Sequence, residues 1–226
     1  MSRITKKPEE RKKQILQSAQ RLFFEEGYEK TSVERIIKEL NLAKGTFYYY
    51  FKSKADLLVA IADQHAERHY EKWQQIIDRA DLNAIEKLNA VFDFSLNLKL
   101  ENKQLILAYL KAMMDEQNII LHYKMAEKRN QVASELLGQV VEQGIREGLF
   151  DTPYPRESII MTFKLADFMT GELVPLLLNM FKDPNYLPLV EEKYDAITYA
   201  MERILGAKKG TIRMYDHDTL KKFAIN

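Results

Sequence analysis

The chain has 226 residues, 46% of them hydrophobic and 30% charged, a composition of folded globular proteins that excludes a disordered or collagen-like chain. The absence of cysteine excludes disulfides, iron–sulfur clusters and thiolate zinc sites. No apolar run suits a signal peptide or a membrane span, so we expect a cytoplasmic protein with no membrane partner. The net charge of +1 divides unevenly: residues 1–60 hold 13 Lys and Arg against 8 Asp and Glu (+5), and the other 166 residues hold 21 against 25 (−4). A basic excess confined to the first segment is typical of a protein in which that segment alone binds nucleic acid.

Two helices are predicted at the start of the chain. Apolar residues from Ile15 to Phe23 recur at helical spacing, and Gly27 can end this first helix in a left-handed conformation. Thr31 and Glu34 have the spacing of a capping box, so a second, short helix is expected to begin at Thr31.

A tight turn and a third short helix follow. Asn41 tolerates the positive φ that such a turn needs, and residues 45–51 leave room for no more than two helical turns. Phe47 and Phe51 are four residues apart, so we expect both to face inward and fix this helix to its neighbours.

The remainder of the chain is predicted to be helical, without a convincing strand. Ser53 and Asp56 can cap a long fourth helix that runs to about Ile77. Pro175 should kink a later helix near Gly171, because it lacks a backbone donor. The further helices are expected at about 82–98, 103–114, 119–148, 156–181 and 187–205.

The segment from Thr31 to Lys54 carries the functional signal. Two short helices joined by a tight turn, the second rich in polar tips, fit a reader that inserts its second helix into the major groove of DNA. Base contacts are expected from Lys44, Gly45, Thr46 and Tyr48, and Tyr49 is a further candidate for contact with DNA. One of the three consecutive tyrosines is expected to pack on the fourth helix, and Tyr50 is the least favoured of them for DNA contact. Phosphate contacts are expected from Thr31, Ser32 and Lys54, at helix N-termini.

This segment resembles the signature of the TetR (tetracycline-repressor-like) family of transcriptional regulators. The matching residues are Leu22-Phe23, Gly27-Tyr28, Thr31-Ser32-Val33, Ile36, Leu42 and the run from Lys44 to Leu57. Asn41 and Ala43 depart from it, because the family usually has glycine and serine there. The resemblance implies an all-α fold, with a three-helix helix-turn-helix DNA-binding domain (1–54) and a helical ligand-binding and dimerisation domain (55–226). It also implies a homodimer through the last two long helices (156–181 and 187–205).

Aromatic and methionine side chains in the C-terminal region suit a small-molecule pocket, although plain core packing explains them as well. The candidates for ligand binding are Phe92, Tyr109, Met113, Phe163 and Phe168. They would favour an apolar or aromatic effector with a small polar handle.

Catalytic and metal sites are not expected. His65 and His69 are four residues apart on one helix, but no third ligand completes a metal site, so we interpret them as an ordinary helix face. No nucleophile elbow, triad or phosphate loop is present, so we predict a protein that is not an enzyme and that needs no cofactor.

The sequence thus predicts a homodimeric regulator that binds a palindromic double-stranded DNA operator and is released by a ligand. A DNA-associated structural or division-site protein with the same reader and no small-molecule ligand is the alternative.

Overall fold

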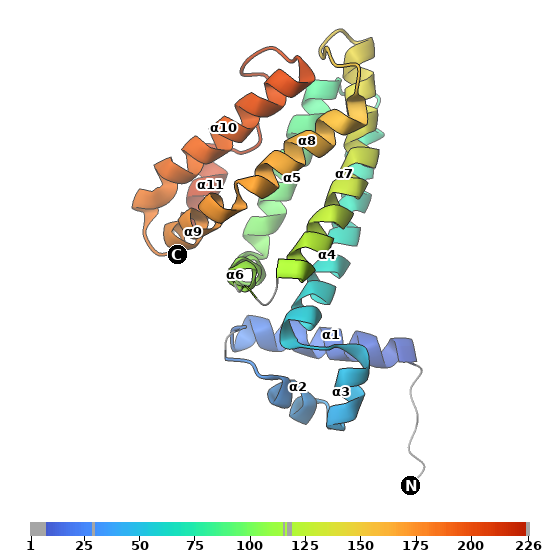
Figure 1. The fold of residues 1–226 in the computed structure, drawn as a ribbon, viewed down its shortest axis with the longest axis vertical. Helices are drawn as coiled ribbons and strands as arrows, with labels where there is room; N and C mark the ends of the chain where they lie inside the picture. The colour runs from blue at the N-terminus through green and yellow to red at the C-terminus, as the bar shows by residue number, and fades with distance from the viewer. Residues whose placement is uncertain (1–7, 29, 115, 117–118, 225–226) are drawn as a thin grey trace. The chain divides into compact units, whose positions relative to one another are not determined.

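The computed structural model describes residues 8–28, 30–114, 116 and 119–224, which form helices and connecting loops without a β-strand (Figure 1). The all-α fold class is therefore confirmed. The α-helices are α1 (Pro8–Glu25), α2 (Val33–Glu39), α3 (Lys44–Tyr50), α4 (Lys54–Ile77), α5 (Ala84–Glu101), α6 (Lys103–Met113), α7 (Ile119–Arg146), α8 (Pro155–Phe168), α9 (Thr170–Met180), α10 (Leu187–Leu205) and α11 (His217–Ala224). Within the described ranges, none of these helices combines the length and the apolarity needed to cross a membrane.

The chain divides into two compact units. The N-terminal unit holds residues 1–67 and 104–118, and the C-terminal unit holds residues 68–103 and 119–226. The predicted domains, 1–54 and 55–226, divide the chain earlier, because the first part of α4 and most of α6 belong to the N-terminal unit.

The N-terminal unit is built on one apolar core. Ile15 and Leu22 of α1, Phe47 of α3 and Leu57 of α4 are fully buried in it. Phe47 and Phe51 both lie inside, as their spacing predicted. Helix α6 contributes Leu105, Ala108 and Ala112 to the same core, so a segment about fifty residues beyond α3 completes it.

The turns and helix caps of this unit agree with the sequence predictions, except for one capping residue. Asn41 has a φ of +50° and Gly27 a φ of +86°, which confirms both predicted left-handed positions. Helix α2 is capped by Ser32, whose Oγ accepts a hydrogen bond from the Arg35 backbone N–H at 3.0 Å. The predicted capping residue, Thr31, is therefore wrong by one position.

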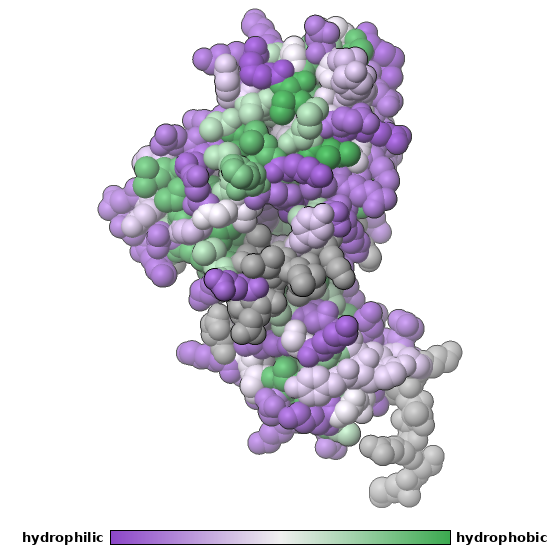
Figure 2. Space-filling model, in the orientation of Figure 1, coloured by the Kyte–Doolittle hydropathy of each residue, from purple (hydrophilic) through white to green (hydrophobic). Residues whose placement is uncertain are grey.

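Helices α8 and α9 replace the single kinked helix that was predicted for residues 156–181. Helix α8 ends at Phe168 and α9 begins at Thr170. Pro175 cannot donate to the Gly171 carbonyl, and its ring crowds that carbonyl, which favours a break in the preceding turn. The ring of Phe168 at this break is 86% exposed, and Figure 2 shows other apolar side chains at the surface of this unit over α8 and α10.

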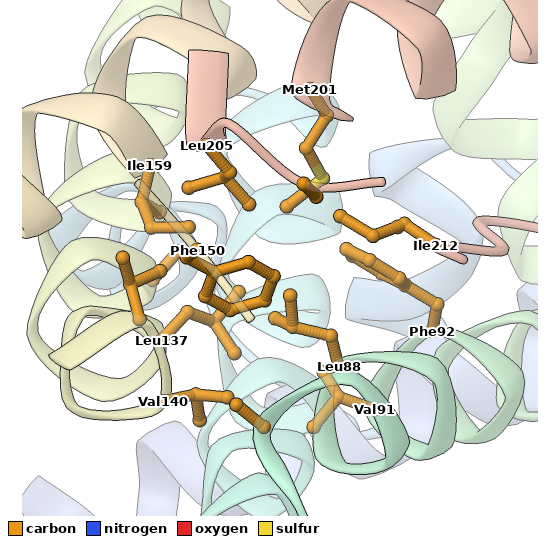
Figure 3. Close-up of a cluster of buried hydrophobic side chains, with 14 of the residues drawn as sticks. Leu88, Val91, Phe92, Leu137, Val140, Phe150, Ile159, Met201, Leu205 and Ile212 are labelled. Carbon is orange, nitrogen blue, oxygen red and sulfur yellow. The ribbon is translucent and has the colours of Figure 1, made fainter. Parts of the chain in front are cut away.

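The core of the C-terminal unit gathers side chains from α4, α5, α7, α8, α10 and the segment after α10 (Figure 3). Phe150 turns back into this core against the backbone of α7. A Cβ atom at Gly144 would lie 2.1 Å from the Phe150 ring, so only glycine allows this approach. The close contact ties the loop before α8 to the end of α7.

The segment after α10 is ordered by hydrogen bonds to the helices. The buried Glu202 carboxylate accepts the backbone N–H groups of Thr211 and Ile212 at 2.9 and 3.1 Å. Helix α11 then packs against α5 and α10, with Leu220 and Phe223 buried. This C-terminal segment, whose role the sequence does not indicate, therefore closes one side of the C-terminal unit.

Candidate nucleic-acid interface

Helix α3 presents an exposed polar face on a buried apolar one. Lys44, Gly45, Tyr48 and Tyr49 are exposed, with 44% of Tyr48 and 78% of Tyr49 accessible to solvent, while Phe47 between them is fully buried. Because the helix is anchored through its inner face, the outer side chains keep a fixed spacing.

The three consecutive tyrosines of α3 differ in how far they are exposed to solvent. Tyr50 is half-buried and packs against the core, as predicted. The rings of Tyr49 and Tyr50 pack edge to face, with their centres 4.9 Å apart. The rings of Tyr48 and Phe47 pack in the same way, with their centres 5.4 Å apart. Tyr48 and Tyr49 therefore each pack against a neighbouring ring and remain exposed to solvent.

Lys44 begins α3 and keeps its ammonium group in solvent. Its Nζ lies 3.7 Å from a carboxylate oxygen of Glu34, and both side chains are about two-thirds exposed (68% and 67%). An ion pair this exposed contributes little to stability, because water and salt screen it. The ammonium is therefore available to a stronger acceptor.

Within the described part of the chain, no neighbouring atom requires a glycine at position 45. A Cβ atom added at this helical position would meet no heavy atom within 4 Å. Glycine inside a helix costs roughly 0.5–1 kcal/mol relative to alanine. The missing side chain leaves the outer surface of α3 open to close approach.

The residues predicted to contact phosphate differ in accessibility. Thr31 is fully buried, and its hydroxyl donates to the Gly27 carbonyl at 2.9 Å. The structure thus turns the Thr31 hydroxyl into the N-terminal unit, away from any ligand at the surface. Ser32 is exposed and, although its Oγ accepts the Arg35 N–H, its own hydroxyl proton is free to be donated.

Lys54 begins α4 and is half-buried. Its Nζ donates to the Tyr28 carbonyl oxygen at 3.0 Å and lies 4.2 Å from the centre of the Tyr28 ring. The Ser53 hydroxyl accepts from the Asp56 N–H at 3.0 Å, which confirms the predicted cap of this helix. Lys54 is thus both part of the fold and a cation at a helix N-terminus.

An ion-pair network that the sequence analysis missed joins α1 to α2. The guanidinium of Arg35 lies 2.8 Å from Glu26 and 2.8 Å from Glu39, and Arg21 bonds both Glu25 and Glu39. Hydrogen bonds from Arg35 lower the pKa of Glu39, and those to Glu39 and Glu26 raise the pKa of Arg35. The four-residue spacings of the Arg21–Glu25 and Arg35–Glu39 pairs were the available signal.

Comparisons with known proteins point to one family. The model of the tetR family of bacterial regulatory proteins matches residues 15–61, the segment that forms this interface. The first part of the chain is therefore similar to proteins of the TetR family. An HTH-type transcriptional regulator of Staphylococcus aureus strain USA300 is 35% identical over 103 residues, which cover 46% of this chain and 55% of that protein. The chain therefore matches about half the length of this relative.

Solved structures show the same fold over most of the chain. A TetR-family transcriptional regulator from Pectobacterium atrosepticum has a TM-score of 0.56 at 18% identity, covering 88% of this chain and 90% of its own. SmeT, solved in complex with triclosan, has a TM-score of 0.53 at 18% identity, covering 92% and 98%. At such low identity these likenesses show the fold alone.

The residues predicted to bind a ligand belong to both compact units. Phe92 is almost fully buried and Phe163 half-buried at the core of the C-terminal unit. Tyr109 lies on α6 in the N-terminal unit, and Phe168 is 86% exposed. The side chain of Met113 lies outside the described residues.

His69 is part of an aromatic cluster and is engaged by a hydroxyl. Its Nε2 lies 2.8 Å from the Ser95 Oγ, and its ring contacts Tyr70, Trp73 and Phe94. Burial, together with the positive charge of Lys99, lowers the pKa of His69 to about 4. The His65 side chain lies outside the described residues, and the described ones contain no group of three metal-ligating side chains.

Proposed function

We propose that this protein is a sequence-specific DNA-binding transcription regulator that acts as a homodimer and is released from its operator by a ligand. The exposed face of α3 carries the proposal: Lys44, Gly45, Tyr48 and Tyr49 project from a helix that buried Phe47 holds in place. A short rigid helix with polar tips fits the major groove. We assign base contacts to Lys44, Gly45, Thr46, Tyr48 and Tyr49.

Ser32 and Lys54 are the proposed phosphate contacts. Both lie at helix N-termini, where backbone N–H groups and the helix dipole also favour an anion. The excess of five positive charges in residues 1–60 supports the same assignment, because phosphate contacts dominate the affinity of proteins for DNA. Bacterial DNA lies in the cytoplasm, so we place the protein there.

A homodimer through α8 and α10 is supported by the apolar side chains that these helices expose. Met161 and Phe168 are seven residues apart on one face of α8 and are 49% and 86% exposed. Leu189 and Tyr199 are exposed on α10. Exposed apolar patches of this kind mark protein interfaces, and a symmetric dimer would place two reading helices about 34–36 Å apart on a palindromic site.

Release by a ligand is supported by the continuity of α4. This helix runs without a break from Lys54, at the start of the proposed interface, to Ile77 in the core of the C-terminal unit. A ligand that binds one conformation of this helix better than another shifts the protein towards that conformation, and so changes its affinity for DNA. SmeT, a protein of the same fold, has been solved with the small molecule triclosan.

The test is to select fragments that bind the purified protein from the genome of origin, and then to measure affinity for the selected duplex across a salt series. We expect a dimer on a palindromic site, with affinity that falls steeply as salt rises. Thr46→Ala and Tyr48→Phe should change the preference among operator variants, whereas the exposed Lys52→Ala should not. A monomeric protein, or one without salt-sensitive affinity for any duplex, would contradict the proposal.

A further inference from the structure

Glu34 is an exposed glutamate in the first turn of α2, and its carboxylate is held loosely. The carboxylates near the ends of α1 and α2, those of Glu25, Glu26 and Glu39, each lie within 2.8 Å of an arginine nitrogen. Among the described residues, the charged partner of Glu34 is Lys44, whose ammonium lies 3.7 Å from the carboxylate. Glu34 therefore stands outside the ion-pair network that joins α1 to α2.

The cap of α2 does not require this carboxylate. Because Ser32 is the capping residue, the third helical position, from which the acid of a capping box reaches back, is occupied by Arg35. A carboxylate in the first turn favours the helix dipole, but the dipole does not determine which neighbour the side chain faces. The contact of Glu34 with Lys44 is thus the feature that needs an explanation.

The Glu34 carboxylate lies at the base-reading end of α3. Lys44 is the first residue of α3, and its ammonium lies 3.7 Å from Glu34 and 5.9 Å from the centre of the Tyr48 ring. Lys44 and Tyr48 are among the residues to which we assign base contacts. A negative charge therefore stands beside the proposed DNA-binding surface, where it repels the phosphates of any duplex. We call Glu34 and Lys44 the Glu34–Lys44 pair.

The DNA backbone offers no hydrogen-bond donor to a carboxylate. Its phosphate and sugar oxygens are acceptors, whereas the amino groups of cytosine and adenine donate in the major groove. An ammonium is less selective, because it is a point charge that a phosphate or a base acceptor satisfies alike. Glu34 therefore favours duplexes that present a base amino group to it, and disfavours the others.

We propose that the Glu34–Lys44 pair reads one G·C base pair in each half-site, with Lys44 donating to guanine O6 or N7 and Glu34 accepting from the N4 amino group of cytosine. The guanine acceptors and the cytosine donor lie next to each other on the major-groove edge, as the cation and the anion do on the protein. This inference rests on the proposed function, and it adds a residue of α2 to those that determine the operator.

The test uses the full chain and the duplex that it selects from the genome of origin. Each base pair of one half-site is changed singly, G·C to A·T and A·T to G·C, and a second series replaces each cytosine by 2-pyrimidinone, which lacks the amino group. Fluorescence anisotropy measures the affinity of the wild type, Glu34→Ala, Lys44→Met and the control Glu71→Ala, which removes an exposed carboxylate of the C-terminal unit.

In the wild type and in Glu71→Ala we expect one G·C pair of the half-site whose change to A·T weakens binding by about tenfold or more. Glu34→Ala and Lys44→Met should each reduce the loss at this same position. Replacing its cytosine by 2-pyrimidinone should weaken binding by the wild type more than by Glu34→Ala. Glu34→Ala should also bind an unrelated duplex more tightly than the wild type, because a repulsive charge has been removed.

The inference is overturned if Glu34→Ala keeps the wild-type discrimination at every position, or if Glu34→Ala and Lys44→Met change it at different positions. It is also overturned if no G·C pair of the half-site contributes to wild-type affinity. Any of these results with salt-sensitive operator binding leaves the regulator function standing. A protein without affinity for any duplex overturns both proposals, so the two failures are distinguishable.

Discussion

The ammonium of Lys54 bonds the Tyr28 carbonyl oxygen at 3.0 Å and lies 4.2 Å from the centre of the Tyr28 ring. These contacts join the first residue of α4 to the loop after α1, across 26 residues of chain. The side chain is therefore fixed in position before any ligand arrives, and a fixed cation loses less conformational entropy on binding phosphate than a mobile one.

Lys54→Ala should therefore have two effects. Loss of the hydrogen bond and of the cation–π contact should lower the free energy of unfolding of the N-terminal unit by about 1–2 kcal/mol. DNA affinity should fall by a similar factor on all sequences, and the slope of log affinity against log salt should decrease by about one. Thermal unfolding and fluorescence anisotropy measure the two effects, with the exposed Lys52→Ala as control; a loss confined to certain operators would contradict the assignment to phosphate.

Gly45→Ala separates stability from recognition. Because a Cβ atom at this position meets nothing within 4 Å, the substitution should raise the free energy of unfolding by about 0.5–1 kcal/mol. The same methyl group would stand on the surface that we assign to base contacts, so DNA affinity should fall. Denaturant unfolding and operator titration of the same preparation decide it: a more stable protein with unchanged affinity would show that the DNA backbone or bases do not approach Gly45.

Local features of the N-terminal unit were predictable from the sequence because they depend on neighbouring residues. Asn41 at positive φ and the inward-facing pair Phe47 and Phe51 follow from spacing and from residue type. Thr31 and Ser32 could not be distinguished in this way, since either hydroxyl can cap a helix. The Leu22 and Gly27 carbonyls, which accept the Thr31 hydroxyl, are brought to it by the fold.

Packing between distant parts of the chain could not be predicted, because it depends on residues that are far apart in the sequence. Nothing in the sequence of α6 shows that Ala108 and Ala112 complete the core of the N-terminal unit.

Phe168→Glu should disrupt the proposed dimer. The ring is 86% exposed at the break between α8 and α9, so the substitution removes little packing within the chain and should leave the thermal stability of a monomer nearly unchanged. A carboxylate in the centre of an apolar interface would be desolvated without a partner, which should shift the protein to monomers. Light scattering coupled to gel filtration measures the mass, with exposed Tyr123→Glu on α7 as control. A Phe168→Glu protein that stays dimeric would place the interface elsewhere.

The half-buried His69 should make the C-terminal unit less stable in mild acid. Its pKa is about 4 in the folded chain against 6.5 for the free side chain, so between these values the unfolded chain binds a proton that the folded chain refuses. Stability is therefore fully retained above pH 6.5 and falls as the pH drops towards 4, by up to about 3 kcal/mol from this group. His69→Gln should remove this component, so the difference between the wild-type and variant free energies of unfolding should change across that window. Urea unfolding followed by Trp73 fluorescence measures it; curves that run parallel from pH 7 to pH 4 would show that His69 titrates equally in both states.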